Sequence, residues 1–213
     1  HLYKNNGGIN FTNASIESNI GQEMEARTAI AGDYDNDGDL DLFIGATIGS
    51  SKFFQNNGDG TFQDITNLTG IYVNDQVRGC SWFDFNQDGY LDLYVGLLFE
   101  PNLLYKNNGD GTFIDIAQNV GATGPIGAGI IMGLGAIDYN RDGYQDLYIT
   151  QDNYNGNILL KNENGMFFTD VSYSSQTNLE VMGMGIAFGD INKDGLFDFY
   201  TTNLNENSLL LNS

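Results

Sequence analysis

The sequence predicts an all-β protein, specifically a β-propeller built from four-stranded antiparallel blades. Three observations predict this fold: an internal repeat, short segments rich in aromatic and β-branched residues, and clusters of Gly, Asn and Asp between those segments. Asp33, Asp84, Asp138 and Asp190 mark about four repeats of 51 to 54 residues. A four-stranded sheet of this size cannot bury both faces until neighbouring sheets stack against it. A β-solenoid is the alternative architecture, although its coils are normally shorter.

One complete repeat reads as four strands, which are the segments GCSWFDF, LDLYVGL, NLLYKN and TFIDIAQ within residues 79–118. The turn after the third strand recurs at residues 57–60, 108–111 and 164–165, where Gly and Asn supply the positive φ of a tight hairpin. No segment has a convincing helical periodicity. We therefore expect consecutive antiparallel hairpins along the whole chain.

The two ends of the chain carry incomplete blades within one repeat domain, residues 1–213. The chain begins with a third and a fourth strand, residues 2–5 and 9–14. It ends with a first, a second and a third strand, residues 185–190, 197–202 and 208–211. Three arrangements stay open: a four-bladed closure in which the ends share a blade, part of a larger propeller, and completion by another copy.

Composition indicates a packed and strongly acidic protein. The hydrophobic fraction is 41%, with 14 Phe and 12 Tyr, which separates the chain from disordered acidic segments. The formal charge of −20 repels nucleic acids and anionic membrane surfaces, and no apolar stretch is long enough for membrane insertion. Of the 28 carboxylates, 14 lie in four short loops, so the expected partners of these loops are cations.

The four acidic loops share the pattern D-x-[DN]-x-D-G-x-x-D and lie at residues 33–41, 84–92, 138–146 and 190–198, here called loops 1 to 4. Oxygens at positions one, three, five and nine converge on one point when the chain turns sharply, which Gly at position six permits. Position seven varies, as expected if it contributes its backbone carbonyl. The predicted metal ligands are Asp33, Asp35, Asp37, Asp39 and Asp41; Asp84, Asn86, Asp88, Tyr90 and Asp92; Asp138, Asn140, Asp142, Tyr144 and Asp146; and Asp190, Asn192, Asp194, Leu196 and Asp198.

The expected ion is Ca²⁺, about four ions in all, with one in each loop. Ligands that are all oxygen favour a hard cation, and a flexible loop with many ligands suits Ca²⁺ better than Mg²⁺. No Cys or His lies in the loops, which argues against zinc. An EF-hand needs a bidentate Glu at position twelve, but these loops offer Ile44, Val95, Ile149 and Thr201. The alternative is that the loops are ordinary polar turns without metal. Ordinary turns would not need Asp at positions one, five and nine in all four repeats, so the repeated pattern favours metal binding.

The loops differ in charge, which predicts a ranking of affinity. Loop 1 has five carboxylates and should bind calcium most tightly. Loops 3 and 4 have Arg141 and Lys193 at position four. We expect position four to point outward, but these cations still lower the local negative potential and weaken binding.

The loops alternate with a second motif, LYKNNGDGTFID at residues 104–115 and FQNNGDGTFQD at residues 54–64, with variants at residues 2–13 and 160–170. Together the two motifs resemble the FG-GAP/VCBS repeats of integrin α-chain propellers and of many secreted proteins, and the resemblance covers essentially the whole chain. It implies a propeller of seven or eight blades with calcium between the first and second strands. It also implies an extracellular scaffold for adhesion or for binding a protein or glycan ligand.

The expected function is therefore an extracellular recognition or adhesion module in which calcium is structural and not catalytic. The alternative is a structural subunit that self-associates through its repeat ends. A calcium-dependent polysaccharide-cleaving enzyme is a third reading, but the only histidine is His1 and most carboxylates lie in the loops, so we predict no enzyme activity. Trp82 and Tyr154 are candidates for stacking on sugars, although strand alternation places Trp82 in the core. Cys80 is expected to be a small buried residue in a strand.

Overall fold

The structure, a computed structural model, describes residues 1–124 and 129–213, and in these residues the chain forms five antiparallel sheets. The first sheet comprises β1 (Tyr3–Asn5) and β2 (Phe11–Asn13). Blade 1 comprises β3 (Glu25–Gly32), β4 (Asp41–Ile48), β5 (Lys52–Asn56) and β6 (Phe62–Asp64). Blade 2 comprises β7 (Val77–Phe83), β8 (Asp92–Leu97), β9 (Leu103–Asn107) and β10 (Phe113–Asp115).

Blade 3 comprises β11 (Ile131–Ile137), β12 (Asp146–Gln151), β13 (Ile158–Asn162) and β14 (Phe168–Asp170). Blade 4 has three strands, β15 (Gly183–Gly189), β16 (Asp198–Asn203) and β17 (Ser208–Leu210). Each strand pairs with its neighbour in sequence, as consecutive hairpins require. The predicted all-β architecture of four-stranded antiparallel blades is confirmed.

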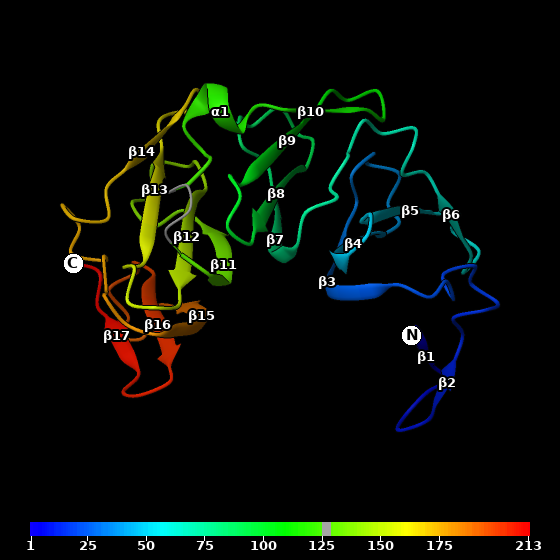
Figure 1. Ribbon diagram of the computed structural model, residues 1–213, viewed down its shortest axis with the longest axis horizontal. Coiled ribbons are helices and arrows are strands. Elements are labelled where there is room, and N and C mark those ends of the chain that lie inside the picture. Colours follow the sequence, from blue (N-terminus) through cyan, green and yellow to red (C-terminus); the bar gives the residue numbers. More distant parts are fainter. Residues whose placement is uncertain (125–128) are drawn as a thin grey trace.

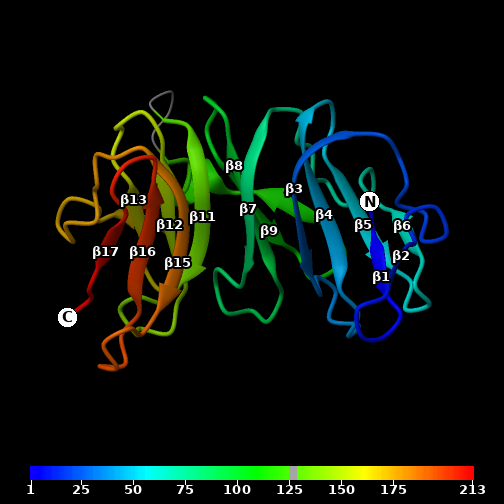
Figure 2. The same cartoon turned by 90° about the horizontal axis from the view of Figure 1, so that it is seen from below.

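The blades follow one another along an arc (Figure 1), and a second view confirms this order (Figure 2). The first strands of neighbouring blades contact one another, β3 with β7, β7 with β11 and β11 with β15. The sheet β1–β2 and blade 4 lie at opposite ends of the arc and are separate sheets (Figure 1). Within the described residues the two ends of this chain therefore do not share a blade, and completion by another copy stays a prediction.

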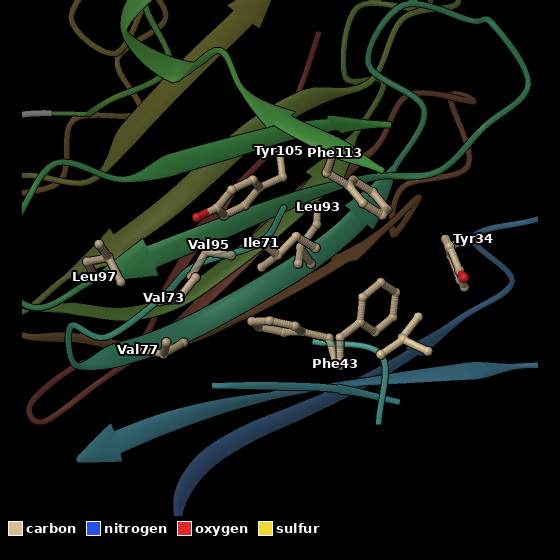
Figure 3. Close-up of a cluster of buried hydrophobic side chains, with 12 residues drawn as sticks. Tyr34, Phe43, Ile71, Val73, Val77, Leu93, Val95, Leu97, Tyr105 and Phe113 are labelled. Carbon is tan, nitrogen blue, oxygen red and sulfur yellow. The ribbon is translucent and has the colours of Figure 1, made fainter. Parts of the chain in front are cut away.

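The hydrophobic core lies between the blades. Between blades 1 and 2, Phe43 and Tyr34 face Leu93, Tyr105 and Phe113 (Figure 3), and all five residues are buried. Equivalent clusters join blade 2 to blade 3 and blade 3 to blade 4. Because each sheet buries its apolar side chains against the next sheet, the stacking of repeats supplies most of the apolar burial in this fold.

The last blade has an uncovered apolar face. Tyr200 and Leu209 are 38% and 46% exposed, whereas their counterparts Tyr148 and Leu159 in blade 3 are fully buried by blade 4. At the other end of the arc, Phe11 of β2 is 59% exposed, although the equivalent residues of β10 and β14 are buried. Both ends of the arc therefore present surfaces that the interior blades bury.

Each of the four first strands has a β-bulge at the equivalent place, near its beginning. In each first strand, one extra residue has no pairing partner in the second strand. These extra residues are Arg27, Arg78, Met132 and Met184. Such bulges locally disrupt the ladder and redirect a side chain. Since each first strand ends at an acidic loop, the bulges lie at the opposite end of the blades from these loops.

Two local features complete the fold. The segment after β10 forms one helical turn, α1 (Ala117–Val120), which the sequence did not predict, and Gly121 ends it with a φ of 72°. Cys80 lies in β7, as predicted, but it is partly rather than fully buried, and it packs against the core between blades 1 and 2. No helix among the described residues has the length and apolar character needed to cross a lipid bilayer.

Candidate metal centre

Each acidic loop connects the first strand of a blade to the second strand. The glycine at position six has a φ between 86° and 94°, which L side chains rarely adopt. The residue at position four also has a positive φ, between 59° and 64°. The glycines are Gly38, Gly89, Gly143 and Gly195, and the position-four residues are Asn36, Gln87, Arg141 and Lys193. Two left-handed residues per loop give the chain the sharp turn that the sequence predicted.

Carboxylates and backbone N–H groups close each loop. In loop 1, Asp33 accepts hydrogen bonds from the backbone N–H groups of Asp37 and Gly38, both at 3.1 Å. Asp37 in turn accepts from the N–H of Asp39 at 2.9 Å. The same bonds from positions five, six and seven recur in loops 2, 3 and 4. The first and fifth side chains are therefore held on the inner side of every loop.

Loop 1 brings three carboxylates together. One oxygen from each of Asp33, Asp35 and Asp37 lies within 4.8 Å of the other two. Asp35 accepts a hydrogen bond from Gln55 on one oxygen at 2.7 Å, while its Oδ1 is buried without a hydrogen-bond partner. A buried carboxylate oxygen without a donor is unfavourable unless a cation satisfies it. Carboxylate oxygens are the usual protein ligands of Ca²⁺, so this cluster fits a calcium ion.

Loops 2, 3 and 4 have an asparagine at position three, which reduces their negative charge. In each loop the amide Nδ2 donates to the carboxylate at position five, over distances of 2.7 to 3.0 Å. In loop 2, Lys106 from β9 also forms an ion pair of 2.9 Å with Asp88. The prediction singled out loops 3 and 4 as the loops with a cation and missed Lys106, because this lysine is 18 residues from its partner in sequence.

Position nine is the most buried part of each loop. Asp41, Asp92, Asp146 and Asp198 are fully buried, and each accepts one N–H bond from position two and one from an asparagine at or just after the end of the third strand. Burial raises the pKa of Asp41 and Asp92 to about 6 and that of Asp146 to about 7, against the opposing effect of these two hydrogen bonds. Asp41 is not in the cluster of loop 1. Its role as a calcium ligand stays a prediction.

The side chain at position seven lies against the glycine turn of its own blade. A Cβ at Gly58 would lie 2.7 Å from Asp39 Oδ2, and a Cβ at Gly109 would lie 2.9 Å from the ring of Tyr90. Tyr144 lies in the same way against Gly165. The position-seven side chain is held against this turn, and the role of its backbone carbonyl as a ligand stays a prediction. This placement explains why a glycine turn accompanies each of these acidic loops.

Position four reaches the next loop. Asn36 donates to the carbonyl of Gly89 in loop 2 at 3.0 Å, and Gln87 donates to the carbonyl of Gly143 in loop 3 at 2.6 Å. The guanidinium of Arg141 lies over Gly195 in loop 4. The expectation that position four points outward is therefore wrong for these residues, because the stacked blades bring consecutive loops side by side.

In blades 2, 3 and 4, an asparagine at or just after the end of the third strand joins neighbouring loops. Asn107 Nδ2 donates to the carbonyl of Tyr34 in loop 1 at 2.8 Å and to that of Leu91 in loop 2 at 3.2 Å. Its backbone N–H donates to Asp92 at 2.8 Å. Asn162 makes the equivalent three bonds one blade further on. Asn212 in blade 4 donates its Nδ2 to the carbonyl of Tyr139 in loop 3 and its backbone N–H to Asp198. We call each of these asparagines an interblade clamp.

The two aromatic candidates for sugar binding differ in exposure. Trp82 is partly buried and packs against the core between blades 1 and 2, with its ring centroid 5.8 Å from that of Phe53. Its core placement is confirmed. Tyr154 lies between β12 and β13 and is 56% exposed, with a φ of 57°. Of the two candidates, Tyr154 is therefore the one with an exposed ring for stacking.

Comparison with known proteins identifies the repeat. The profile of the FG-GAP-like repeat matches residues 33–95, 99–149 and 138–201. The chain belongs to the FG-GAP-like repeat family. Each matched segment includes at least one acidic loop and ends within the strand that follows a loop. The family resemblance inferred from the two motifs is confirmed.

Curated relatives of this FG-GAP-like chain include cartilage acidic protein 1. The Xenopus tropicalis protein is 28% identical over 204 residues, which cover 90% of this chain and 31% of that protein. The Homo sapiens protein is 33% identical over 94 residues, 44% of this chain and 14% of that protein. The chain thus spans less than a third of the length of these relatives.

Solved structures share the fold at low sequence identity. One concerns specific recognition of non-reducing terminal N-acetylglucosamine by an Agrocybe aegerita lectin, with a TM-score of 0.52 and 18% identity over 93% of this chain and 54% of that chain. Another is BBS1N in complex with ARL6DN, with a TM-score of 0.52 and 11% identity over 89% of this chain and 59% of that chain. At these identities the likeness concerns the fold alone.

Proposed function

We propose that this FG-GAP-like chain is an extracellular recognition module whose acidic loops each bind one structural Ca²⁺ ion. The observation that carries the proposal is loop 1, where three carboxylates converge and Asp35 Oδ1 is buried without a partner. Four copies of the loop on neighbouring blades favour a common role. Calcium bound there would hold each loop and, through the interblade clamps, the adjoining blade.

Several further observations support an extracellular setting. The relatives are named cartilage acidic protein 1, and this chain is itself acidic, with a formal charge of −20. Calcium is abundant outside cells, so sites of modest affinity would be filled there. The proposed partner is a protein or a glycan, and Tyr154 offers an exposed aromatic surface to it. The proposed role is not catalytic, because the only histidine is His1.

The proposal is tested by melting the protein in excess EDTA and in excess calcium. A site filled to 100 times its Kd adds about 2.7 kcal/mol to the free energy of unfolding, so several sites should raise the Tm by many degrees. Asp35→Ala should reduce this calcium-dependent rise. Asp59→Ala is the matched control, because Asp59 lies in the exposed turn between β5 and β6. No rise with calcium, together with no bound metal by elemental analysis, would refute structural metal sites.

A second candidate function is a subunit that self-associates through the ends of the arc. The exposed Tyr200 and Leu209 favour it, because the same positions are fully buried between the interior blades. Burying them against a second copy would follow the apolar stacking of the other blades. Sedimentation velocity over a range of concentrations separates the two candidates. A monomer at all concentrations excludes self-association, whereas growing oligomers support it.

A further inference from the structure

The bulges of the first strands place two arginines on neighbouring, contacting strands of a strongly acidic molecule. Arg27 is the bulge residue of β3 and Arg78 that of β7, at equivalent register positions. The strands β3 and β7 contact one another across the interface of blades 1 and 2. The pair therefore lies at the end of the blades opposite the acidic loops, away from the candidate metal sites.

Neither arginine has a carboxylate partner. The ion pairs of the described residues involve Lys52, Lys106 and Lys161. The four residues outside the described ranges are Pro, Ile, Gly and Ala, which have no charged side chain. Two neighbouring cations without a counter-ion are unusual in a chain with 28 acidic and only 8 basic residues.

Arg78 also has an unsatisfied donor. Its Nε is buried and has no hydrogen-bond partner, although the side chain as a whole is half-buried. Burial and then the charge of Arg27 lower the pKa of Arg78, while Asp152 of blade 3 opposes them. Asp152 forms no ion pair with either arginine, so the pair keeps a net positive charge and a free donor.

We propose that Arg27 and Arg78 form a binding site for a single oxyanion group, such as a carboxylate or a sulfate. Guanidinium groups present paired N–H donors that match the oxygens of such an anion, and an anion here would satisfy the Nε of Arg78. The formal charge of −20 repels extended polyanions, which restricts the ligand to one anionic group. That group comes either from a small free anion or from a carboxylate on a partner protein.

The other two blades supply the matched substitutions. Met132 and Met184 occupy the same bulge position in β11 and β15, so Arg27→Met and Arg78→Met introduce a residue that the repeat already accepts there. We expect both variants to fold, as a melt in calcium would verify. Lys4→Met is the control for loss of one positive charge, because Lys4 is exposed on β1 and forms no ion pair in the described structure.

The direct measurement is NMR of the arginine Nε–Hε groups in the calcium-loaded protein. The chain has only three arginines, Arg27, Arg78 and Arg141, so each signal can be assigned by substitution. Titration with sodium acetate or sodium sulfate at constant ionic strength should shift the Arg78 and Arg27 signals saturably and leave Arg141 unchanged. Each single Met variant should bind the anion about tenfold more weakly, and Lys4→Met should bind as the parent does.

A second titration distinguishes the two sources of the anion. A short peptide with one Asp and an amidated C-terminus is compared with the same peptide carrying Asn. Tighter binding of the Asp peptide than of acetate assigns the site to a partner protein, and equal binding assigns it to a small anion. The proposal is overturned if the three arginine signals move together without saturation, or if the Met variants bind acetate and sulfate as the parent does. Neither result depends on whether the acidic loops bind calcium.

Discussion

The interblade clamp at Asn107 should stabilise two blades at once, and its removal should cost more than removal of any one hydrogen bond. Asn107→Ala loses side-chain bonds to the carbonyls of Tyr34 and Leu91 and to the N–H of Gly109, at 2.8, 3.2 and 2.9 Å. Asn107 is 1% exposed and Tyr34 5% exposed, so water cannot readily replace the bond between them. At about 1 kcal/mol per bond, and more where a buried group is left unpaired, the expected loss is about 3–4 kcal/mol.

The matched control is Asn56→Ala, at the same position of blade 1. The Asn56 side chain bonds only to the carbonyl of Leu40 and the N–H of Gly58, and Leu40 is 58% exposed, so loss of this side chain should cost about 1 kcal/mol. Melts of both variants in saturating calcium should therefore differ by about 5–10 °C, given roughly 2–4 °C per kcal/mol for a chain of this size. Equal shifts in Tm for the two variants would refute the interblade contribution.

Two further predictions concern titratable groups. In EDTA, the free energy of unfolding should fall as the pH rises from about 4.5 to 7. Asp41, Asp92 and Asp146 have pKa values of about 6 to 7 in the folded state, whereas an unfolded Asp has a pKa near 3.9. The folded state therefore binds more protons than the unfolded state in this range, and raising the pH favours unfolding. Carboxylates with a lowered pKa, such as Asp64 and Asp88, change the stability only at pH values below this range. Urea titrations that show stability rising between pH 4.5 and 7 would contradict the raised pKa values of the three buried aspartates. Burial raises the pKa of the Cys80 thiol to about 11. A thiol reagent at pH 8 should therefore modify Cys80 only after the protein is unfolded by urea. Rapid labelling of the native protein would contradict this burial.

The blades and loops were predictable because their signals are local. Gly58 and Gly109 mark turns that need a positive φ, and the alternation of apolar residues marks the strands between them. The predicted second strand at residues 91–97 differs from β8 by one residue at its start. Repetition of the same signals in four places then indicates the stacking, since each sheet needs a neighbour to bury its faces.

The contacts between blades were not predictable from these signals. Asn107 and Tyr34 are 73 residues apart, and nothing in their spacing indicates which carbonyl the asparagine reaches. The bulge residues Arg27 and Arg78 are hidden for a similar reason, because a single extra residue in a strand becomes visible only when its pairing partner is known. Lys106 reaches Asp88 only because the third strand lies beside the second.

The clamps also determine where this chain can be lengthened or shortened. Each clamp joins a carbonyl of one blade to an asparagine of the next, so a cut inside a blade removes partners from two interfaces. Insertion or loss of a complete unit of 51 to 54 residues instead leaves every asparagine facing an equivalent carbonyl. Duplication of whole repeats therefore preserves every interblade clamp. The number of blades can change without a new kind of contact between blades.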